Sequence, residues 1–513
     1  MNKETFSIDQ ITWNDLDLTE IYNRMNICHS SVGAEVLKQT LTELVFDESI
    51  LQERHQKAVS LQENHTRSNK LNKIFTNLGK TKKVSFLDYI FKLNEIKPES
   101  NIKHFVLIVL LLISIALIFV KPVIGIIALV VMIAVNIALY FRFKAPVEPY
   151  FNCIKYLASM VIAGDKIKDV LKGAGDVFTA DRDELERLVK VFGQIRRGSF
   201  LITNSVSGSL VDVIMDYIRM LFHVDLIKFH SMHKYCSQHE EDIRTLYDTL
   251  GGIETVICIA HFREEHPSYC LPVFHKDPST LLSLKTENAY HPLVKDPVKN
   301  SITAERSILL TGSNASGKST FLKMIAINQI FAQTICTVLA DSFETSFFRV
   351  YSSMALSDNI LGEESYFVVE IKSMKRIFDA LSQESPVMVF VDEVLRGTNT
   401  QERIAASTQI LRKLSTENAL CFAATHDIEL TQLLEDVMDN YHFSEQIQED
   451  SGHITFDYKL KNGRADSRNA ILLLKAYGFP QEVVDAAFSM TENHTDKIEK
   501  NNTNSQEIPL KNK

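Results

Sequence analysis

The sequence has little that would indicate a bound zinc ion. Its seven cysteines are scattered without a CxxC pair, and its sixteen histidines include no HExxH motif. Spacings of these kinds hold zinc in small structural domains and in metalloproteases. We therefore expect reduced thiols in a cytosolic compartment and no structural zinc. Four histidines that lie close together in the sequence are expected to be solvated helix residues, namely His223, His230, His233 and His239.

Positive charge is not in excess either. The chain carries 55 lysines and arginines against 64 aspartates and glutamates, a formal net charge of −9. A protein that coats duplex DNA usually has a basic surface, because its cations replace the counterions of the phosphates. The total charge therefore gives no global sign of DNA binding, although a local basic patch can lie within an acidic chain.

Long apolar runs are confined to one part of the chain. Residues 105–120 and 123–141 contain no charged side chain, and Lys121 and Pro122 separate them. A helix rises about 1.5 Å per residue, so the first run reaches roughly 24 Å against a hydrocarbon core of roughly 30 Å. The second run is long enough to cross. Because the connection is so short, the pattern predicts a transmembrane helical hairpin at 103–143.

The flanks of this hairpin predict its orientation. Lys103 and His104 precede the apolar runs, and Arg142 and Lys144 follow them. Positive residues are typical of the cytoplasmic side, and a hairpin returns both of its ends to one side. We therefore expect a protein of the cell membrane whose soluble parts both face the cytoplasm. Two alternatives stay open: a shallow re-entrant hairpin, and a helical pair buried in a soluble core.

A glycine-rich segment with a lysine lies between an apolar run and a helix-like stretch. It reads Thr-Gly-Ser-Asn-Ala-Ser-Gly-Lys-Ser-Thr at 311–320. Glycines let the backbone curl so that successive N–H groups face phosphate oxygens, the lysine adds a point charge, and the next hydroxyl binds Mg²⁺. The spacing predicts a phosphate loop with these cofactor-binding residues: Gly312, Ser313, Asn314, Ala315, Ser316, Gly317, Lys318, Ser319 and Thr320.

Two further apolar runs end in polar residues that suit ATP hydrolysis. Residues 387–391 lead into Asp392 and Glu393, and residues 419–424 lead towards His426. Such runs are typical of buried parallel strands. At the first strand tip, Asp392 is suited to the Mg²⁺ shell and Glu393 to polarising the attacking water. At the second, His426 is predicted to sense the γ-phosphate or contact that water, although a histidine there can also be structural.

These motifs and the segments around them resemble the ATPase domain of the MutS family. Residues 357–370 are similar to the family's signature segment, and residues 392–400 and 424–426 to the motifs that follow it. Residues 463–467 are similar to its closing segment, and residues 478–484 to the helix-turn-helix dimerisation element after that segment. The resemblance also extends, less sharply, to the helical first half of the chain.

The resemblance implies an ABC-type ATP hydrolase that uses ATP and Mg²⁺ and works as a homodimer. In such a dimer Ser365 of one subunit contacts the γ-phosphate held by the other, so that hydrolysis is coupled to dimer geometry. Ser365 can alternatively be a simple helix cap. The aromatic that stacks on adenine in the family is not evident near Val298, and Tyr290 and His291 are the candidates for that place.

The expected fold is an α-helical lever region that contains the transmembrane hairpin, followed by an α/β P-loop ATPase domain of the ABC type. The two parts of the helical core are assigned to residues 1–100 and 145–285. After them we expect a MutS-like ATPase domain at 286–460, a helix-turn-helix dimerisation element at 461–490 and a disordered tail at 491–513.

Two classes of process compete for what the ATPase drives. The resemblance favours DNA binding in mismatch repair or recombination, on duplex, mismatched or branched DNA. A mismatch-recognition domain is not expected, because the helical core begins near residue 5, and the hairpin takes the place of the family's DNA clamp. The alternative is a membrane mechanoenzyme without a repair role, which acts on an envelope protein or a lipid. A transporter fits less well, because the Leu-Ser-Gly-Gly-Gln signature is absent.

Overall fold

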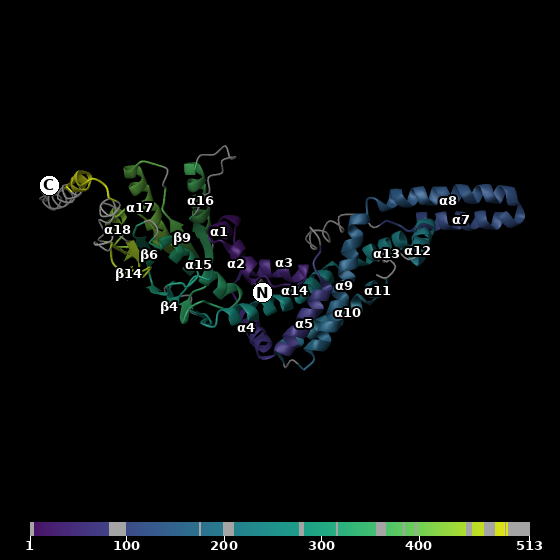
Figure 1. The fold of residues 1–513 in the computed structure, drawn as a ribbon, viewed down its shortest axis with the longest axis horizontal. Helices are drawn as coiled ribbons and strands as arrows, with labels where there is room; N and C mark the ends of the chain where they lie inside the picture. Colours follow the sequence, from purple (N-terminus) through teal and green to yellow (C-terminus); the bar gives the residue numbers. More distant parts are fainter. Residues whose placement is uncertain are drawn as a thin grey trace, which may run out of the picture. The chain divides into compact units, whose positions relative to one another are not determined.

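The chain, seen in a computed structural model, divides into two compact units that alternate along the sequence. The first unit consists of residues 1–21, 42–51 and 266–513, and the second of residues 22–41 and 52–265. The first unit therefore includes two short N-terminal segments together with the C-terminal part of the chain. The predicted domain boundaries do not include this division. The elements of both units are drawn in Figure 1. The structure describes residues 5–81, 99–173, 176–198, 210–275, 282–313, 316–354, 366–382, 385–395, 398–447, 454–465, 478–487 and 489–490.

The first unit is an α/β fold in which strands and helices alternate from β8 to β11. Its elements are β1 (Thr5–Ser7), α1 (Gln10–Asp15), β2 (Glu43–Val45), β3 (Val273–Phe274), β4 (Leu284–Ala289), β5 (Asn300–Ala304), β6 (Ser307–Thr311), α15 (Lys318–Thr334), β7 (Ser342–Thr345), β8 (Arg349–Ser353), α16 (Tyr366–Leu381), β9 (Val387–Asp392), α17 (Thr400–Thr416), β10 (Ala419–Ala424), α18 (Glu429–Leu433), β11 (Met438–His442), β12 (Glu445–Ile447), β13 (Ile454–Phe456) and β14 (Lys461–Asn462).

A six-stranded sheet with the order β14-β11-β6-β10-β9-β8 forms the middle of this unit. All neighbours are parallel except β11 and β14. The strands β6, β9 and β10 are buried along almost their whole length, which explains why their sequences are continuous apolar runs. Ala424 at the end of β10 lies opposite both Leu310 and Asp392. The C-terminal ends of these three strands therefore meet at one edge of the sheet.

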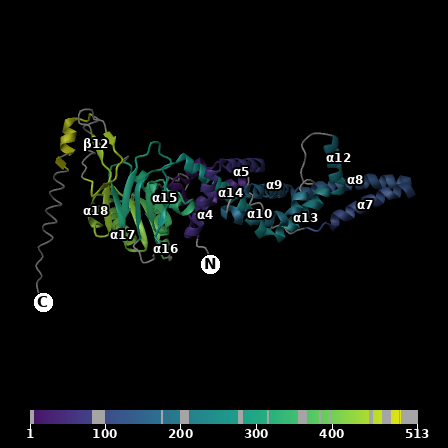
Figure 2. The same ribbon diagram turned by 90° about the horizontal axis from the view of Figure 1, so that it is seen from below.

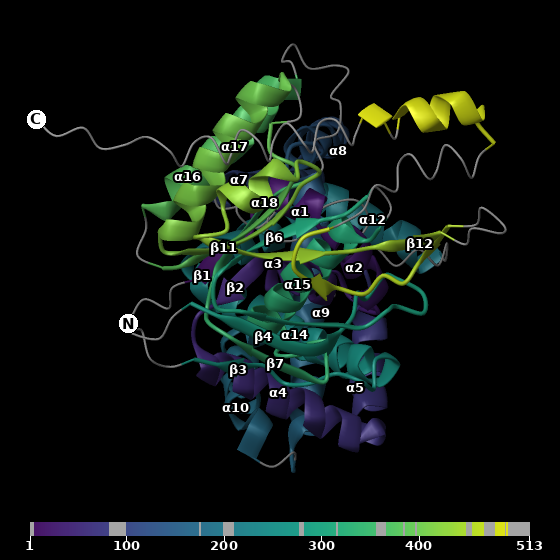
Figure 3. The same cartoon turned by 90° about the vertical axis from the view of Figure 1, so that its left-hand side faces the viewer.

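Helices cover both faces of this sheet. Helix α15 lies between it and a four-stranded sheet with the order β3-β7-β4-β5 (Figure 3). Because α15 is enclosed on both sides, it carries buried polar groups that need partners, and Gln329 accepts a hydrogen bond from Thr345 of β7 at 2.8 Å. On the opposite face, α16 and α17 pack on alternate residues of β9 and β10 in one apolar cluster. This sandwich fixes the strand tips between two rigid layers.

The second unit is helical throughout its described residues. Its elements are α3 (Ser31–Thr42), α5 (His65–Leu78), α7 (Ile102–Val120), α8 (Pro122–Lys144), α9 (Glu148–Leu171), the 3₁₀ turn η1 (Asp176–Phe178), α10 (Thr179–Val191), α11 (Gly193–Gly198), α12 (Leu210–Phe222), α13 (Val224–Gln238) and α14 (Glu240–Glu265). The helices α2 (Leu18–Met25) and α4 (Glu48–Glu63) include residues of both units.

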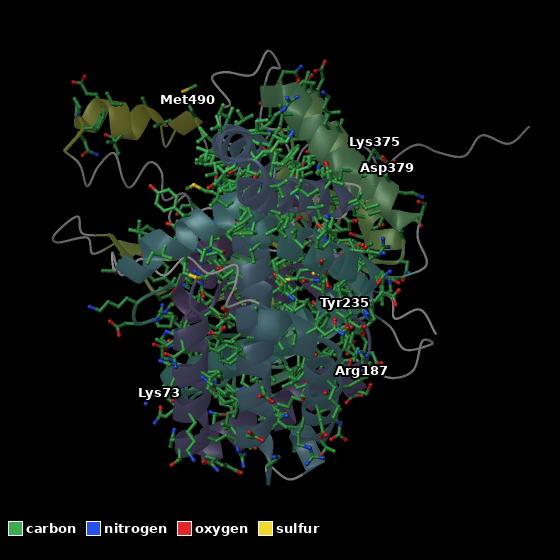
Figure 4. All side chains as sticks on the ribbon, turned by 90° about the vertical axis from the view of Figure 1, so that its right-hand side faces the viewer. Lys73, Arg187, Tyr235, Lys375, Asp379 and Met490 are labelled. Atoms are coloured by element: carbon green, nitrogen blue, oxygen red, sulfur yellow. The ribbon has the colours of Figure 1, made fainter. Side chains whose placement is uncertain are left out.

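Helix α9 packs against α5, α10, α13 and α14 and so holds this unit together. Charged groups join the same helices. Arg187 of α10, labelled in Figure 4, pairs with Asp242 of α14 at 2.7 Å. The buried carboxylate of Glu254 in α14 accepts hydrogen bonds from the backbone N–H groups of His29 and Ser30 at 2.6 and 3.2 Å. This carboxylate satisfies two backbone donors of the segment that leads into α3.

Two antiparallel helices, α7 and α8, run through the predicted hairpin and meet at Lys121 (Figure 1). They pack tightly near the tip, because a Cβ at Gly125 would lie 2.4 Å from the backbone nitrogen of Ile118. Both helices are long and apolar enough to cross a membrane, by length and composition, and only 17% of each apolar window is buried. Large side chains such as Phe119 and Val123 are exposed. A pair hidden in a soluble core is therefore not what the structure shows.

The expectation that the neighbouring histidines are solvated is wrong for three of the four. His223, His230 and His233 are at most 4% exposed. They are buried because α13 packs into the unit: the ring of His233 lies 6.0 Å from that of Phe229, and His223 contacts His104 of α7 through their Nδ1 atoms at 2.8 Å. Burial lowers the pKa of His223 and of His230, which keeps both rings neutral at neutral pH.

Candidate ATP-binding site

The phosphate-loop segment joins β6 to α15, as its strand–loop–helix pattern predicts. Gly312 has a φ of +145°, and a Cβ there would lie 2.7 Å from the carbonyl oxygen of Phe443, so only glycine fits. Gly317 precedes Lys318, the first residue of α15, and the dipole of a helix favours an anion at its N-terminus. Asn314 and Ala315 lie outside the described residues.

The amine of Lys318 is drawn into the loop. It donates hydrogen bonds to the carbonyl oxygens of Gly312 at 2.8 Å and Ser313 at 2.9 Å. Its side chain is buried, and Nζ lies 3.4 Å from Nε2 of His426. A buried ammonium group held by neutral carbonyls is a strong binding point for phosphate, because little water screens its charge.

The two predicted Mg²⁺ ligands contact each other. The hydroxyl of Ser319 donates to Oδ2 of Asp392 at 2.5 Å, and so joins the start of α15 to the tip of β9. A hydroxyl and a carboxylate are hard oxygen ligands, and Mg²⁺ usually takes one or two of these from the protein beside phosphate oxygens and water. The residues present therefore fit a phosphate-bound Mg²⁺.

The two predicted catalytic side chains also lie together. Oε1 of Glu393 is 2.9 Å from Nε2 of His426. Glu393 has a φ of +58°, which is uncommon for a residue with a side chain and is found where a site holds the backbone in place. Its N–H donates to the carbonyl oxygen of Ala424 at 2.9 Å. The sheet thus sets the separation between carboxylate and imidazole.

Two supports from neighbouring helices fix the loops that follow these strands. Arg403 of α17 makes a two-point ion pair with Asp427, the residue after His426, at 2.9 and 2.6 Å. The buried carboxylate of Glu370 in α16 accepts a hydrogen bond from the N–H of Leu395. Both loops are therefore braced by charged side chains from helices on the same face of the sheet.

Most of the predicted phosphate-binding and catalytic residues line one pocket of about 550 Å³. It is large enough for a nucleotide, since ligand pockets usually span about 300–1,000 Å³. Of the predicted cofactor-binding and catalytic residues, the described ones that line it are Ser313, Gly317, Lys318, Ser319, Thr320, Asp392, Glu393 and His426. Gly312 and Ser316 lie in the loop beside it, and Ser365 lies outside the described residues. The site in the first unit thus contains most of the set that the sequence predicts.

The pocket also has a wall that the sequence reading missed. Tyr458 follows β13, about 140 residues after the loop, and its ring would lie 3.2 Å from a Cβ at Gly317. Asn300 at the start of β5 fixes this segment, because its Nδ2 donates to the carbonyl oxygen of Tyr458 at 2.9 Å. Of the two aromatic candidates for the base, His291 lines the pocket, whereas Tyr290 is not among the lining residues. Local sequence offers no signal for Tyr458, because a contact with the distant residue Asn300 holds it near the loop.

Lowering the pH is expected to destabilise the protein through His291. Burial, assisted by the charge of Lys323, lowers the pKa of His291 to about 4. An unfolded histidine titrates at about 6.5, so unfolding takes up a proton below that pH. The stability contributed by the neutral ring is present above pH 6.5 and falls by up to about 3 kcal/mol as the pH approaches 4. Denaturant unfolding of the detergent-solubilised chain at several pH values, compared with His291→Asn, checks this.

The variant should lose less stability than the wild type over that pH range, because asparagine does not titrate and can still accept the hydrogen bond that the N–H of Leu293 gives to Nδ1 of His291 at 3.2 Å. Equal losses in both proteins would contradict the assignment.

Comparison with known proteins shows which family this part of the chain is similar to. Residues 308–495 match the family model described as MutS domain V. The chain is 29% identical over 294 residues to the DNA mismatch repair protein MutS of Thermotoga sp. (strain RQ2), which covers 55% of this chain and 36% of that protein. It is 27% identical over 330 residues to MutS protein homolog 4 of Mus musculus, which covers 60% of this chain and 33% of that protein.

The chain spans about a third of the length of these curated relatives. The match to the domain model includes the phosphate loop, both acidic residues and His426, which the structure gathers in one pocket. Residues 308–495 are therefore a homologue of MutS domain V, which is an ATP-hydrolase domain.

Proposed function

We propose that the pocket is where this ATPase domain binds ATP and Mg²⁺. The observation that carries the proposal is the contact of Ser319 with Asp392 beside the buried amine of Lys318. Lys318 neutralises phosphate charge, and Ser319 and Asp392 hold the metal. Bound Mg²⁺ supplies further compensation of charge on the phosphates. The loop N–H groups at 312–320 complete the phosphate cradle.

The hydrolytic step is assigned to Glu393 and His426. The carboxylate of Glu393 is the acceptor for a proton of the attacking water, and its hydrogen-bonding partner His426 senses the γ-phosphate. His426 suits that role because it lies between Glu393 at 2.9 Å and the amine of Lys318 at 3.4 Å. One imidazole therefore touches both the group that activates water and the group that binds phosphate.

The base is proposed to lie against Tyr458 and His291. Tyr458 is 44% exposed and lines the pocket beside Gly317, so its ring has a free face next to the phosphate loop. Aromatic rings pack on the faces of bases in a way that tolerates different bases. The arrangement accounts for adenine binding without an aromatic residue near Val298.

The ATPase is proposed to work as a homodimer in which Ser365 of one copy completes the site of the other. This part of the proposal is supported by the family resemblance of residues 357–370 and by the named relatives. Magnesium-dependent ATP turnover by the purified full chain, measured over a range of chain concentrations, tests it. Turnover per chain should rise as dimers form. A rate per chain that is independent of concentration down to the monomer would overturn the dimer, and no turnover at any concentration would overturn the site.

We propose that the α7–α8 hairpin anchors the chain in a membrane. Two exposed apolar helices, joined at Lys121, would have a high free energy in water. Both flanks carry positive residues, so the soluble units are placed on the cytoplasmic side of the cell membrane. Membranes washed at alkaline pH should retain the full chain in the pellet. A variant in which a short Gly-Ser linker replaces residues 105–141 should move to the supernatant and keep its ATP turnover. Release of the full chain by the wash would contradict the anchor.

For the process that the ATPase drives, we propose coupling to DNA in mismatch repair or recombination, on the basis of the relatives' names alone. The alternative is work on an envelope protein or lipid, which the exposed hairpin and the net charge of −9 favour. Mobility shifts with duplex, mismatched and branched DNA, titrated with salt, separate the two. DNA binding that weakens with salt supports the first, and its absence on every substrate leaves the second.

A further inference from the structure

Helix α12 carries an apolar face that is exposed in the part of its unit that the structure describes. Its described side chains are those of residues 213–222, and none of these is buried. The most exposed apolar ones follow each other at spacings of one, three and one residues, which places them on one side of a helix. They are Val213 at 50%, Ile214 at 58%, Tyr217 at 58% and Ile218 at 37% exposure.

The opposite side of α12 packs on the hairpin. Arg219 is directed inward, with its side chain only 12% exposed and paired with Asp216 at 2.9 Å. The helix contacts both α8 and α7. It ends at Phe222, and the next residue is His223, whose Nε2 lies 3.2 Å from the backbone oxygen of Asn136 in α8. Two contacts, with His104 of α7 and with Asn136 of α8, therefore fix the level at which α12 meets the hairpin.

That level is the polar end of the hairpin. Tyr140 donates to Asp225 at 2.7 Å and accepts a hydrogen bond from Lys144 at 2.8 Å, while Arg142 is exposed. Tyrosine together with lysine and arginine is typical of the boundary between lipid and water. From Asn136 to the tip at Lys121 the hairpin extends about 23 Å, at about 1.5 Å per residue. The apolar part of the hairpin thus lies on one side of α12, and the charged part on the other.

The direction of α12 fits such a boundary. In Figure 2 it runs across the hairpin axis and not along it. A helix that crosses a membrane-spanning pair at its polar end lies in the plane of the membrane surface. Amphipathic helices in that plane bury their apolar face at the border of headgroups and acyl chains.

We propose that α12 is a membrane-surface helix whose residues Val213, Ile214, Tyr217 and Ile218 contact the headgroup–acyl border of the phospholipid bilayer that the hairpin enters. The inference rests on the proposed hairpin anchor and adds to it a second contact with lipid. Continuity decides for lipid as the occupant: α12 contacts α7 and α8, whose apolar side chains are largely exposed, so a bilayer around the hairpin reaches α12. The helix then limits how far the hairpin sinks.

Tryptophan quenching in vesicles tests this. The full chain has one native tryptophan, Trp13, whose emission in the parent protein is the background to subtract. Tyr217→Trp reports on α12, and Phe119→Trp, at a position 86% exposed near the hairpin tip, reports on the hairpin. Each variant is reconstituted in phosphatidylcholine vesicles with a minority of phosphatidylglycerol. The phosphatidylcholine is brominated either near the headgroups or near the ends of the acyl chains.

For Tyr217→Trp, bromines near the headgroups should remove about half of the added emission and deep bromines clearly less, since such helices lie about 5–10 Å deep. For Phe119→Trp, deep bromines should quench more. Quenching at Phe119→Trp without quenching at Tyr217→Trp overturns the membrane contact of α12 but not the hairpin anchor. This result is expected if a second copy of the chain covers α12. Equal depth for both variants also overturns it. No quenching of either overturns the anchor itself.

Discussion

Replacing Glu393 with glutamine is expected to leave ATP binding intact and to lower hydrolysis by at least about a hundred-fold, the usual contribution of a positioned general base. Glutamine keeps the size of the side chain and its hydrogen bond to Nε2 of His426, now 2.9 Å from Oε1 of Glu393. It cannot accept a proton from water at neutral pH. The proposed contacts of Lys318 with phosphate and of Ser319 with Mg²⁺ do not involve Glu393, so only the chemical step should suffer.

Steady-state release of phosphate and equilibrium binding of ATP, measured on the same preparation, check the Glu393→Gln result. Glu417→Gln is the matched control, because this glutamate pairs with Lys413 on the surface and is not among the residues that line the pocket. The control should turn over ATP at the wild-type rate. A Glu393→Gln protein that hydrolyses ATP as fast as the wild type would remove Glu393 from the mechanism.

Replacing Lys318 with alanine is expected to weaken ATP binding by about ten- to a hundred-fold. Hydrogen bonds to charged groups contribute about 1.5–3 kcal/mol each, and 1.4 kcal/mol corresponds to a factor of ten in affinity. The loss of affinity should be large because the Lys318 side chain is only 5% exposed, so water does not compensate for the missing positive charge. Turnover at limiting ATP should fall at least as far as affinity.

Titration calorimetry in the Glu393→Gln background measures this affinity without hydrolysis. Lys323→Ala is the control, because Lys323 lies in the same helix and pairs with Asp17 at 2.6 Å but does not line the pocket. Its affinity for ATP should stay within a few-fold of the parent. If Lys318→Ala binds ATP as tightly as Lys323→Ala does, the phosphates do not lie on this loop.

The part of the site that could be predicted from the sequence is the part that is local. The phosphate loop is a contiguous strand–loop–helix segment, and Asp392, Glu393 and His426 each follow an apolar run that only a buried strand explains. Parallel strands bring their C-terminal ends to one edge, so their convergence follows from topology. The apolar hairpin could be predicted for a similar reason, since two uncharged runs with a two-residue break leave few other arrangements.

What could not be predicted depends on contacts between distant segments. Tyr458 reaches the loop only because Asn300 of β5 holds its backbone. The burial of His223 and His230 follows from the packing of α13 beside the hairpin, and a polar residue on a helix gives no sign of that. The assignment of residues 1–21 and 42–51 to the ATPase unit is of the same kind. In each of these cases, contacts between distant segments outweighed a local pattern that favoured an exposed side chain or a helical region.

The backbone hydrogen bonds at the strand tips have a consequence for rigidity. The N–H of Thr425 donates to Leu310 and that of Glu393 to Ala424, each at 2.9 Å, so the sheet ladder continues past its last paired residues into the catalytic positions. Moving the backbone of Glu393 or Thr425 therefore requires breaking hydrogen bonds at the end of the central sheet. Amide protons of Glu393 and Thr425 should accordingly exchange with solvent as slowly as those of the core strands, and thermal softening of the pocket should coincide with loss of the whole domain.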